Sequence, residues 1–479
     1  MIRLPLAPTL AIVAVTCMSN SRAQGFSSGE VSAGGASTSY RLLAPAKMEE
    51  GKRYPLVLFL HGAGERGSDN ELQLKHFPEK MLTDERRAAY PCFLLAPQCP
   101  EGERWTTDDW GAPYSGRLPV EPTAPMAGAI EAMLKTVSEQ PIDTDRIYLT
   151  GLSMGGYGTF ELAMRHHDWF AAVAPICGGG DLESAANLVG LPLSIWHGDK
   201  DDAVPVERSR QMMSALQMMG LKADYHELAG VGHNAWTAAY GPEGCLDWMF
   251  AQTRNPARRA ELAADLLARS VEKSDRIAFL GDSITQQGAG EGGFVDILRA
   301  GLKRGRPDAA VIPAGISGHK VPDLLAREER DVRAKGANLV FLYIGINDVW
   351  HSESGRGTSR DEFSAGMKEL LRRLEDLGKA TVALATPSVI GEGPFGSGSL
   401  DEMLEDYATI TRALANDEGR ALADLQARFR DHLRLFNAEG KKSGVLTTDG
   451  VHLNAAGNQF LAVEAALALR HASLSRTAD

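Results

Sequence analysis

The sequence predicts the α/β fold class, with two successive units that each contain a mostly parallel sheet covered by helices. Three observations support this prediction. Short apolar runs alternate with amphipathic helical patterns in both halves of the chain, which is typical of parallel sheets buried on both faces. The length of 479 residues exceeds what one hydrophobic core usually accommodates. Between the two alternations lies 253–274, an Ala- and Arg-rich stretch at helical period that we expect to be a linking helix.

The start of the chain has the pattern of an export signal. Arg3 precedes an apolar run from Leu4 to Met18, and the small residues Ser21 and Ala23 fit a cleavage site. We therefore expect residues 1–23 to be removed near Ala23 and the protein to be secreted or periplasmic. Cys17 leaves a lipoprotein alternative open. The run is short for a membrane span and no second one follows, so no span is expected.

Charge and cysteine content narrow the partners. A net charge of −12 argues against nucleic acid or an anionic membrane, which attract basic patches. Four cysteines remain after position 17, and disulfide bridges and buried thiols are both open interpretations: Cys92, Cys99, Cys177 and Cys245. No cysteine or histidine cluster is typical of zinc, and we expect neither a metal nor an organic cofactor. The sequence leaves the oligomeric state open.

The first unit is expected over 24–252. Its Gly- and Ser-rich start, Gln24 to Thr38, is interpreted as a mobile lead-in. The expected strands are Tyr40–Leu43, Leu56–Leu60, Phe93–Ala96, Arg146–Thr150, Ala171–Pro175, Pro192–His197 and Ala223–Leu228. The expected helices include Met126–Glu139, Tyr157–His166 and Val206–Met219. In such sheets the chemistry gathers at the carboxyl ends of the strands.

Ser153 stands at one such strand end, in the sequence Gly151-Leu-Ser-Met-Gly155 between a strand and a helix. A turn this tight strains the backbone of its central residue, and only small neighbours permit it. The serine hydroxyl then points above the sheet. The following helix offers unpaired N–H groups to a developing negative charge.

A histidine and an aspartate follow at later strand ends. His233 is the candidate general base that takes the proton of Ser153, and Asp201 is the candidate that orients it. Asp199 and Asp202 are rival acids in the same turn. Enzymes whose serine nucleophile lies in a turn between a strand and a helix have their catalytic residues in the chain order Ser, Asp, His.

Backbone N–H groups complete the first candidate site. We assign the oxyanion donors to the N–H groups of Ala63, in a Gly-rich turn after a strand, and of Met154. Several aromatic side chains are candidates either for a substrate cleft or for packing: His61, Trp105, Trp110 and Trp236.

This half resembles the α/β-hydrolase esterases, in the branch with feruloyl-esterase-like and polyhydroxybutyrate-depolymerase-like members that is often labelled "predicted peptidase". The matching pieces are YPLVLFLHGAGERG, APQCPEGERW, GLSMGGYG, WHGDKDDAVP and GHNAW. The family pattern H-G-x-x-D-x-x-V-P implies that the acid is Asp201. The resemblance extends from about Tyr40 to Gln252.

A second α/β alternation is expected over 275–479. Its expected strands are Arg276–Leu280, Ala309–Pro313, Asn338–Ile344, Thr381–Ala385 and Ala421–Leu425. Its expected helices include Phe294–Lys303, Asp323–Lys335, Asp361–Leu377, Asp401–Asp417 and Ala455–Ala472. The pattern predicts a parallel sheet in three layers and is not a repeat of the first half.

Four short blocks of this unit resemble those of the SGNH (GDSL-like) hydrolases, which implies a three-layer α/β/α, flavodoxin-like fold. They are Gly281-Asp-Ser-Ile-Thr285, Ala314-Gly-Ile-Ser-Gly318, Gly345-Ile-Asn-Asp348 and Asp449-Gly-Val-His452. The resemblance implies that Ser283 is the nucleophile, that His452 is the general base and that Asp449 orients His452.

The same resemblance implies an oxyanion hole formed by the Ser283 N–H, the Gly318 N–H and the Asn347 side chain. An asparagine amide suits this role because it donates without a charge. Gly315 is the alternative to Gly318 as donor. Trp350 is a candidate for lining the pocket, and packing is its alternative role.

Taken together, the motifs predict two serine esterase units acting on an esterified substrate, with acetylated or feruloylated polysaccharide as the favoured polymer. One alternative is a peptidase, phospholipase or lipase in the first half, with an acetylesterase or lysophospholipase in the second. The other is that one half is an inactive carbohydrate-binding module. Triad chemistry by itself does not separate ester from amide cleavage.

Overall fold

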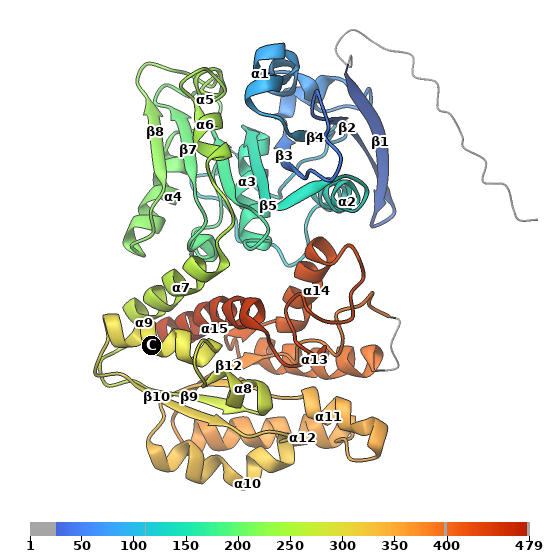
Figure 1. Cartoon of the computed structure of the whole chain (residues 1–479). Coiled ribbons are helices and arrows are strands. Elements are labelled where there is room, and N and C mark those ends of the chain that lie inside the picture. Colours follow the sequence, from blue (N-terminus) through green and yellow to red (C-terminus); the bar gives the residue numbers. More distant parts are fainter. Residues whose placement is uncertain (1–24, 111, 397–399, 477–479) are drawn as a thin grey trace, which may run out of the picture.

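The structure is a computed structural model that describes residues 25–110, 112–396 and 400–476. Two α/β units are stacked, the first containing the blue to green segments and the second the yellow to red segments of Figure 1. Each unit has its own sheet and core, which confirms the predicted fold class. The expected export signal lies outside the described residues.

The first sheet has eight strands within the described residues, in the order β1-β2-β4-β3-β5-β6-β7-β8. Strands β3 to β8 are mutually parallel, whereas β1 and β2 run antiparallel to their neighbours. The strands are β1 Phe26–Ala33, β2 Ala36–Leu43, β3 Tyr54–Leu60, β4 Phe93–Pro97, β5 Ile142–Leu152, β6 Ala172–Ile176, β7 Ser194–Gly198 and β8 Asp224–Leu228. Continuous apolar sequence makes β3, β4 and β6 buried along their whole length.

Helices cover both faces of this sheet. One core lies between the sheet and α2, α3 and α4, and a second core includes residues of α5 and α6. The helices are α1 Asp84–Ala89, α2 Ala124–Glu139, α3 Met154–Arg165, α4 Glu207–Met218, α5 Trp236–Ala239 and α6 Cys245–Phe250.

The expected mobile lead-in is wrong. Phe26–Ala33 and Ala36–Leu43 form a hairpin whose register pairs Phe26 with Leu43. Gly34 and Gly35 form its turn, and both have positive φ (57° and 83°). Two-residue hairpin turns need positive φ, so the pair of glycines makes this turn rather than a flexible tail.

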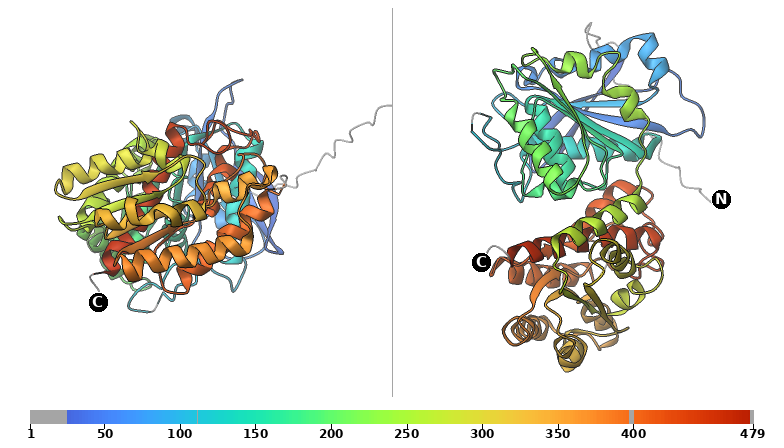
Figure 2. Two further views of the ribbon diagram at one scale, coloured as in Figure 1. Left: turned by 90° about the horizontal axis from the view of Figure 1, so that it is seen from below. Right: turned by 90° about the vertical axis from the view of Figure 1, so that its left-hand side faces the viewer.

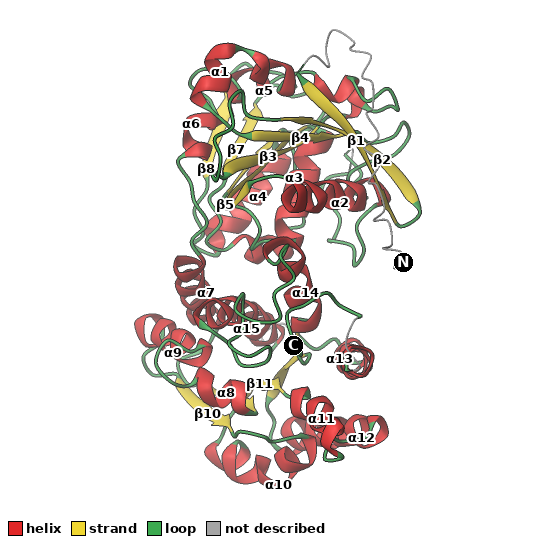
Figure 3. Cartoon of the chain, turned by 45° about the vertical axis from the view of Figure 1, so that its right-hand side comes forward, coloured by secondary structure: helices red, strands yellow, loops and turns green. Residues whose placement is uncertain are grey.

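The second sheet is parallel, in the order β10-β9-β11-β12-β13. Its strands are β9 Arg276–Gly281, β10 Ala310–Gly315, β11 Leu339–Tyr343, β12 Thr381–Ala385 and β13 Leu422–Ala423. Its helices are α7 Pro256–Ser270, α8 Ser283–Gly288, α9 Phe294–Gly305, α10 Val321–Asp331, α11 Ile346–Trp350, α12 Arg360–Arg372, α13 Asp401–Asn416, α14 Leu425–Phe436 and α15 Ala455–Ser475. Helices α7, α9 and α15 lie above the sheet in Figure 1 and α10 and α12 below it, as Figure 3 also shows.

Helix α7 follows the last helix of the first unit and buries its apolar face in the second core. Ala260, Ala263 and Leu267 belong to that core, and α7 packs against α9 and α15. Asn255 caps its first turn by accepting from the Arg258 N–H. The segment therefore forms part of the second unit's packing as well as connecting the two sheets.

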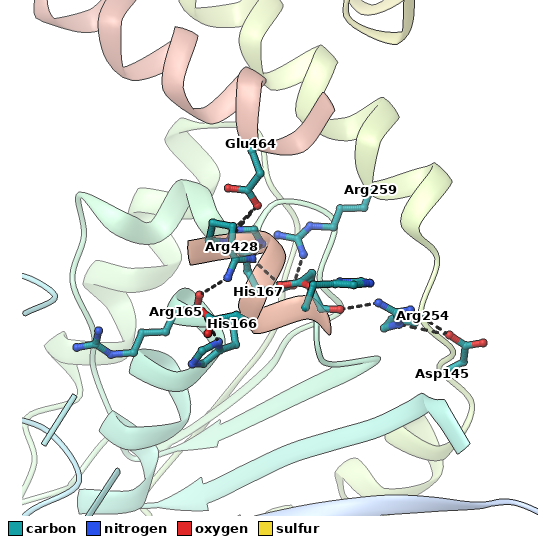
Figure 4. Close-up of polar contacts among 11 residues, drawn as sticks. Asp145, Arg165, His166, His167, Arg254, Arg259, Arg428 and Glu464 are labelled. Carbon is teal, nitrogen blue, oxygen red and sulfur yellow. Dashed lines mark hydrogen bonds and ion pairs between the residues drawn. The ribbon is translucent and has the colours of Figure 1, made fainter. Parts of the chain in front are cut away.

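The two units lie against each other (Figure 2), and polar side chains, among them Arg428 of α14, meet at their interface (Figure 4). Arg428 donates to the Asp168 carboxylate at 2.5 Å, and His432 Nδ1 lies 2.7 Å from the other carboxylate oxygen. Leu435 joins the core of the first unit. Burial alone would raise the pKa of Asp168, but Arg428 and His432 hold it well below its ordinary value.

Within the described residues, the four cysteines at positions 92, 99, 177 and 245 are free and buried. Of the two interpretations that the sequence left open, the structure has the buried thiols. None of the helices in this part of the chain combines the length and apolarity that a bilayer crossing requires.

Candidate active sites

The sheet registers bring the first set of motif residues together. Strands β3 and β5 are parallel neighbours, with Leu60 opposite Gly151, so the turn after β3 lies beside the turn after β5. Strands β7 and β8 are also neighbours, with Gly198 opposite Leu228. The loops that carry Asp201 and His233 therefore leave the same edge of the sheet side by side.

Ser153 occupies the strained turn that its neighbours predict. Its backbone has φ 55° and ψ −119°, a region that L-residues rarely adopt. A Cβ on Gly155 would lie 1.9 Å from the Leu60 carbonyl oxygen, and one on Gly156 would lie 2.4 Å from the Ile176 carbonyl oxygen. Glycine is therefore required at both positions because the helix start is pressed against two strands.

The first site contains a hydrogen-bonded Ser–His–Asp chain. Ser153 Oγ lies 2.9 Å from His233 Nε2, and His233 Nδ1 lies 2.7 Å from Asp201 Oδ2. The Asp201 side chain is fully buried. Of the three rival carboxylates, the structure brings Asp201 to the histidine. Asp199 instead accepts from the Gly230 N–H and ties the two loops together.

His197 is a partner of Asp201 that the sequence reasoning did not assign. Its Nε2 lies 3.3 Å from Asp201 Oδ2, and its side chain has no solvent exposure. Burial alone would raise the pKa of Asp201. Hydrogen bonds from His197 and His233 and from the Val204 N–H outweigh burial and lower that pKa well below its ordinary value. The sequence signal that indicates His197 is its place as the second residue of the motif WHGDKDD, directly before Gly198.

Cys177 completes the surroundings of this carboxylate. Atoms of Cys177, Asp201 and His233 lie within 4.8 Å of one another, a spacing that a metal ion could bridge. Both nitrogens of His233 are already engaged, however, by Ser153 and by Asp201. Burial also raises the pKa of the Cys177 thiol, which opposes the thiolate that a metal needs. We therefore assign this group to the Ser–His–Asp chain.

The candidate oxyanion donors are placed at two starts of helical structure. Met154 is the first residue of α3, so its N–H has no acceptor within the helix. Ala63 begins a short 3₁₀ turn, Ala63–Glu65, directly after β3. These two N–H groups therefore follow the ends of two adjacent strands, β3 and β5, beside Ser153.

For two of the aromatic candidates, the structure has the packing role of the two that the sequence left open. His61 and Trp105 are completely buried. The Trp105 indole donates to the His61 carbonyl, and the imidazole accepts from the Cys99 N–H, so both side chains hold loops together. Burial lowers the pKa of His61 to about 4. Trp236, in contrast, lies edge-on to the catalytic candidate His233, with ring centroids 5.2 Å apart.

The second site is assembled by three neighbouring strands. β9 lies between β10 and β11, and Gly281 is opposite both Gly315 and Tyr343. The loops after these strands carry Ser283, Gly318 and Asn347. They meet because parallel strands end at the same edge of a sheet.

The second Ser–His–Asp chain has the same connectivity as the first. Ser283 Oγ lies 2.9 Å from His452 Nε2, and His452 Nδ1 lies 2.8 Å from Asp449 Oδ2. Asp449 also accepts from the backbone N–H groups of Val451 and His452. Burial would raise the pKa of Asp449, and the hydrogen bonds from His452 and from these N–H groups together lower it.

The glycine alternatives in the second site differ in their surroundings. A Cβ on Gly315 would lie 2.3 Å from the Gln286 nitrogen, so Gly315 is packed against α8. Gly318 has φ 77° and faces open space, with only the His351 ring within 4 Å. The Asn347 side chain is buried and donates to the His319 carbonyl at 3.1 Å. Of the two glycines, Gly318 is the one whose Cα faces open space.

Trp350 flanks the second site. Its ring is edge-on to His452, with centroids 6.2 Å apart, as Trp236 is to His233 in the first site. In both Ser–His–Asp chains, therefore, the imidazole contacts a carboxylate on one side and an indole on another.

Comparison with known proteins adds the family context. The GDSL-like lipase/acylhydrolase family matches residues 279–460, and the dienelactone hydrolase family matches residues 114–252. An acetylxylan esterase of Geobacillus stearothermophilus is 31% identical over 211 residues, which cover 40% of this chain and 92% of that protein. The crystal structure of a thermostable esterase has 36% identity and a TM-score of 0.45, covering 49% of this chain and 64% of its own. That of the acetyl xylan esterase AlAXEase has 39% identity and a TM-score of 0.39, covering 40% and 96%.

The fold and these relatives define a carboxylic ester hydrolase. The chain belongs to the GDSL-like lipase/acylhydrolase family through its second half, and its first half is an α/β-hydrolase domain of the dienelactone hydrolase family.

Proposed function

We propose that the protein carries two independent serine esterase sites, one in each half, and that it deacylates acetylated or feruloylated polysaccharide outside the cytoplasm. The proposed domains follow the two sheets: residues 24–252 and 275–479, joined by 253–274. The observation that carries the proposal is the pair of Ser–His–Asp chains, in which every link is 2.7–2.9 Å long.

In the first site, Ser153 attacks the ester carbonyl while His233 takes its proton. His233 becomes an imidazolium, and Asp201 stabilises that charge and fixes the tautomer. The N–H groups of Ala63 and Met154 stabilise the oxyanion that forms on the former carbonyl oxygen. His233 then protonates the leaving alcohol, and water releases the acyl group by the reverse steps.

In the second site, Ser283, His452 and Asp449 perform the same proton transfers. The oxyanion is stabilised by the N–H groups of Ser283 and Gly318 and by the Asn347 amide. The Asn347 amide has two N–H bonds, and only one of them is engaged by the His319 carbonyl. The other is available to the oxyanion.

The choice of substrate is supported by one relative, an acetylxylan esterase that is matched over 92% of its length. Acetyl groups on a sugar polymer are small esters that a shallow, solvent-accessible site can reach. The side chain of His233 is 25% exposed and that of His452 is 21% exposed, which agrees with reaction at the surface of a large substrate.

Three full-length variants test the proposal: Ser153→Ala, Ser283→Ala and the double variant. They are assayed on acetylated xylan, feruloylated xylan and short-chain p-nitrophenyl esters. Each single variant is expected to lose on the order of 10⁴-fold or more of its own site's turnover and to keep the other site's, as removal of a triad member does elsewhere. Activity that survives in the double variant, or that is confined to lipid or peptide substrates, would contradict it.

Export is tested separately. The protein collected from outside the cytoplasm is expected to begin near Gln24, which mass spectrometry of the intact chain measures. A chain that retains Met1 and stays in the cytoplasm would overturn this part.

A further inference from the structure

The base of the loop that carries Asp449 and His452 is hydrogen-bonded to a buried carboxyl group, that of Glu392. This residue follows β12 and is only 1% exposed. Its Oε1 accepts from the Leu446 N–H at 2.6 Å, from the Thr447 N–H at 2.5 Å and from the Thr447 hydroxyl at 2.8 Å. Its Oε2 accepts from the Val445 N–H at 2.7 Å.

The loop above these contacts is a closed unit. Thr447 and Leu453 form an antiparallel bridge, and the Thr448 N–H donates to the His452 carbonyl at 2.7 Å. The Gly450 N–H donates to the Thr447 hydroxyl oxygen at 3.0 Å. The positions of Asp449 and His452 are thus set by the residues at the base of the loop, which are the ones that Glu392 holds.

The backbone around Glu392 strengthens the same attachment. The Glu392 N–H donates to the Lys442 carbonyl at 3.0 Å, and the Gly391 N–H donates to the Gly450 carbonyl at 2.8 Å. The Asn437 side chain, directly after α14, donates to the Glu392 carbonyl at 2.6 Å. The segment is tied to both sides of the loop.

The loop also has apolar support, because Leu446, Val451 and Leu453 belong to the second core. Val445 and Leu446 line a cavity of about 360 Å³ between the two units. Above them the Asp449 side chain is 49% exposed. The polar contacts to Glu392 therefore fix the base of the loop in addition to these apolar contacts.

We propose that Glu392 is a positioning residue of the second site, which holds Asp449 and His452 in reach of Ser283 through the base of their loop. This inference rests on the proposed function of that site. Glu392 does not touch the reacting atoms. Its effect on turnover comes from the distance between His452 and the serine, since a misplacement of about 1 Å lowers turnover by roughly 10²-fold.

The test uses the full-length Ser153→Ala chain, in which turnover of p-nitrophenyl acetate reports the second site alone. Glu392→Gln keeps the size of the side chain but directs an NH₂ group at one of the N–H donors. It is expected to lower kcat on the order of 10²-fold and to change KM less than about threefold. Rates are expressed per serine titrated with a fluorophosphonate, so that a smaller folded fraction does not imitate the effect.

Asp275→Asn is the matched control. Asp275 is also a 1% exposed carboxyl group of the second unit; it accepts from the Glu272 N–H and the Asn338 side chain and forms an ion pair with Arg476. It precedes β9, whereas Ser283 follows β9, so it lies at the opposite edge of the sheet. The control is expected to keep kcat per titrated site. Thr447→Val removes one of the four hydrogen bonds to Glu392 together with the acceptor of the Gly450 N–H, and its expected loss of kcat lies between those of Asp275→Asn and Glu392→Gln.

The outcomes separate this inference from the proposed function. A Glu392→Gln chain with kcat per titrated site within threefold of its parent overturns the inference. If the Ser153→Ala chain has no turnover, the proposed activity of the second site is wrong. In that case hydrogen exchange tests whether Glu392 holds the loop. Amides of residues 445–447 and 450–452 are expected to exchange at least about tenfold faster in Glu392→Gln, with β9 unchanged. Unchanged exchange in the loop also overturns the inference.

Discussion

Arg428 offers a sharp test of the contact between the two units. It reaches from α14 to Asp168 at 2.5 Å, and its Nε lies 3.3 Å from Glu464. The exposed fractions of these three side chains are 13%, 10% and 8%. Arg428→Met therefore leaves two buried carboxylates without their cation. Breaking a buried ion pair in this way destabilises proteins by roughly 3–5 kcal/mol.

The lower end of that range is expected here, about 3 kcal/mol, because His432 still donates to Asp168. The matched control is Arg434→Met on the same helix. Arg434 also pairs across the interface, with Glu131 of α2, but its side chain is 42% exposed. Exposed pairs contribute about 0–1 kcal/mol, so this control is expected to stay within about 1 kcal/mol of the parent.

Urea unfolding measures both variants. All tryptophans except Trp350 precede residue 253, so tryptophan fluorescence follows mainly the first unit, while circular dichroism follows both. In Arg428→Met the two probes are expected to separate into two transitions, because the units lose their mutual stabilisation. If Arg428→Met loses no more stability than Arg434→Met, the buried cluster does not hold the units together.

Three further predictions follow from buried groups. Burial lowers the pKa of His61 to about 4, against about 6.5 when unfolded, so the unfolded chain binds more protons between these values. His61 should therefore contribute a fall in stability of about 3 kcal/mol as pH drops from 6.5 to 4, in addition to what other buried histidines contribute. A urea midpoint that is flat from pH 7 to 5 in wild type, or equally sloped in His61→Gln, would contradict this. Gly155→Ala, whose Cβ would meet the Leu60 carbonyl at 1.9 Å, should abolish first-site turnover with the second site retained, whereas Gly64→Ala, with nothing within 4 Å, should be silent in the same two assays. A thiol reagent should label the four buried cysteines only after unfolding, and rapid labelling of the native protein would show that a thiol is accessible: Cys92, Cys99, Cys177 and Cys245.

The parts of the sites that the sequence predicts are those that follow strand ends. Ser153, His233, Ser283 and His452 each stand in a short motif after or near an apolar run, and parallel strands necessarily end at one edge. Buried residues that hold the catalytic loops in place without contacting the reacting atoms are not predicted by the sequence. Glu392 stands alone in a Gly- and Pro-containing segment, and its role depends on a loop more than fifty residues away, so no local pattern indicates it.

Amino-acid composition led to a wrong or missing prediction for two elements, the hairpin Phe26–Leu43 and helix α14. The stretch with Gly34 and Gly35 was interpreted as a mobile lead-in, although two glycines between alternating residues also encode a hairpin turn. Helix α14, Leu425–Phe436, was not predicted at all. Arg428 and His432 place polar side chains on the face that meets the first unit, where both contact Asp168.

The position of the interface also bears on how two esterase sites would share one polymer. Helix α3 begins directly after Ser153 and ends at Arg165, whose carbonyl accepts from Arg428 of α14. A helix of twelve residues is about 18 Å long, so the second unit packs against the edge of the first sheet that lies opposite Ser153. The first site therefore faces away from the second unit, and a single ester group cannot pass from one serine to the other within a shared cleft. If both sites act as proposed, turnover on a polymer carrying both acyl types should equal the sum of the Ser153→Ala and Ser283→Ala rates. A sum that falls well short of the parent rate would contradict this independence of the two sites.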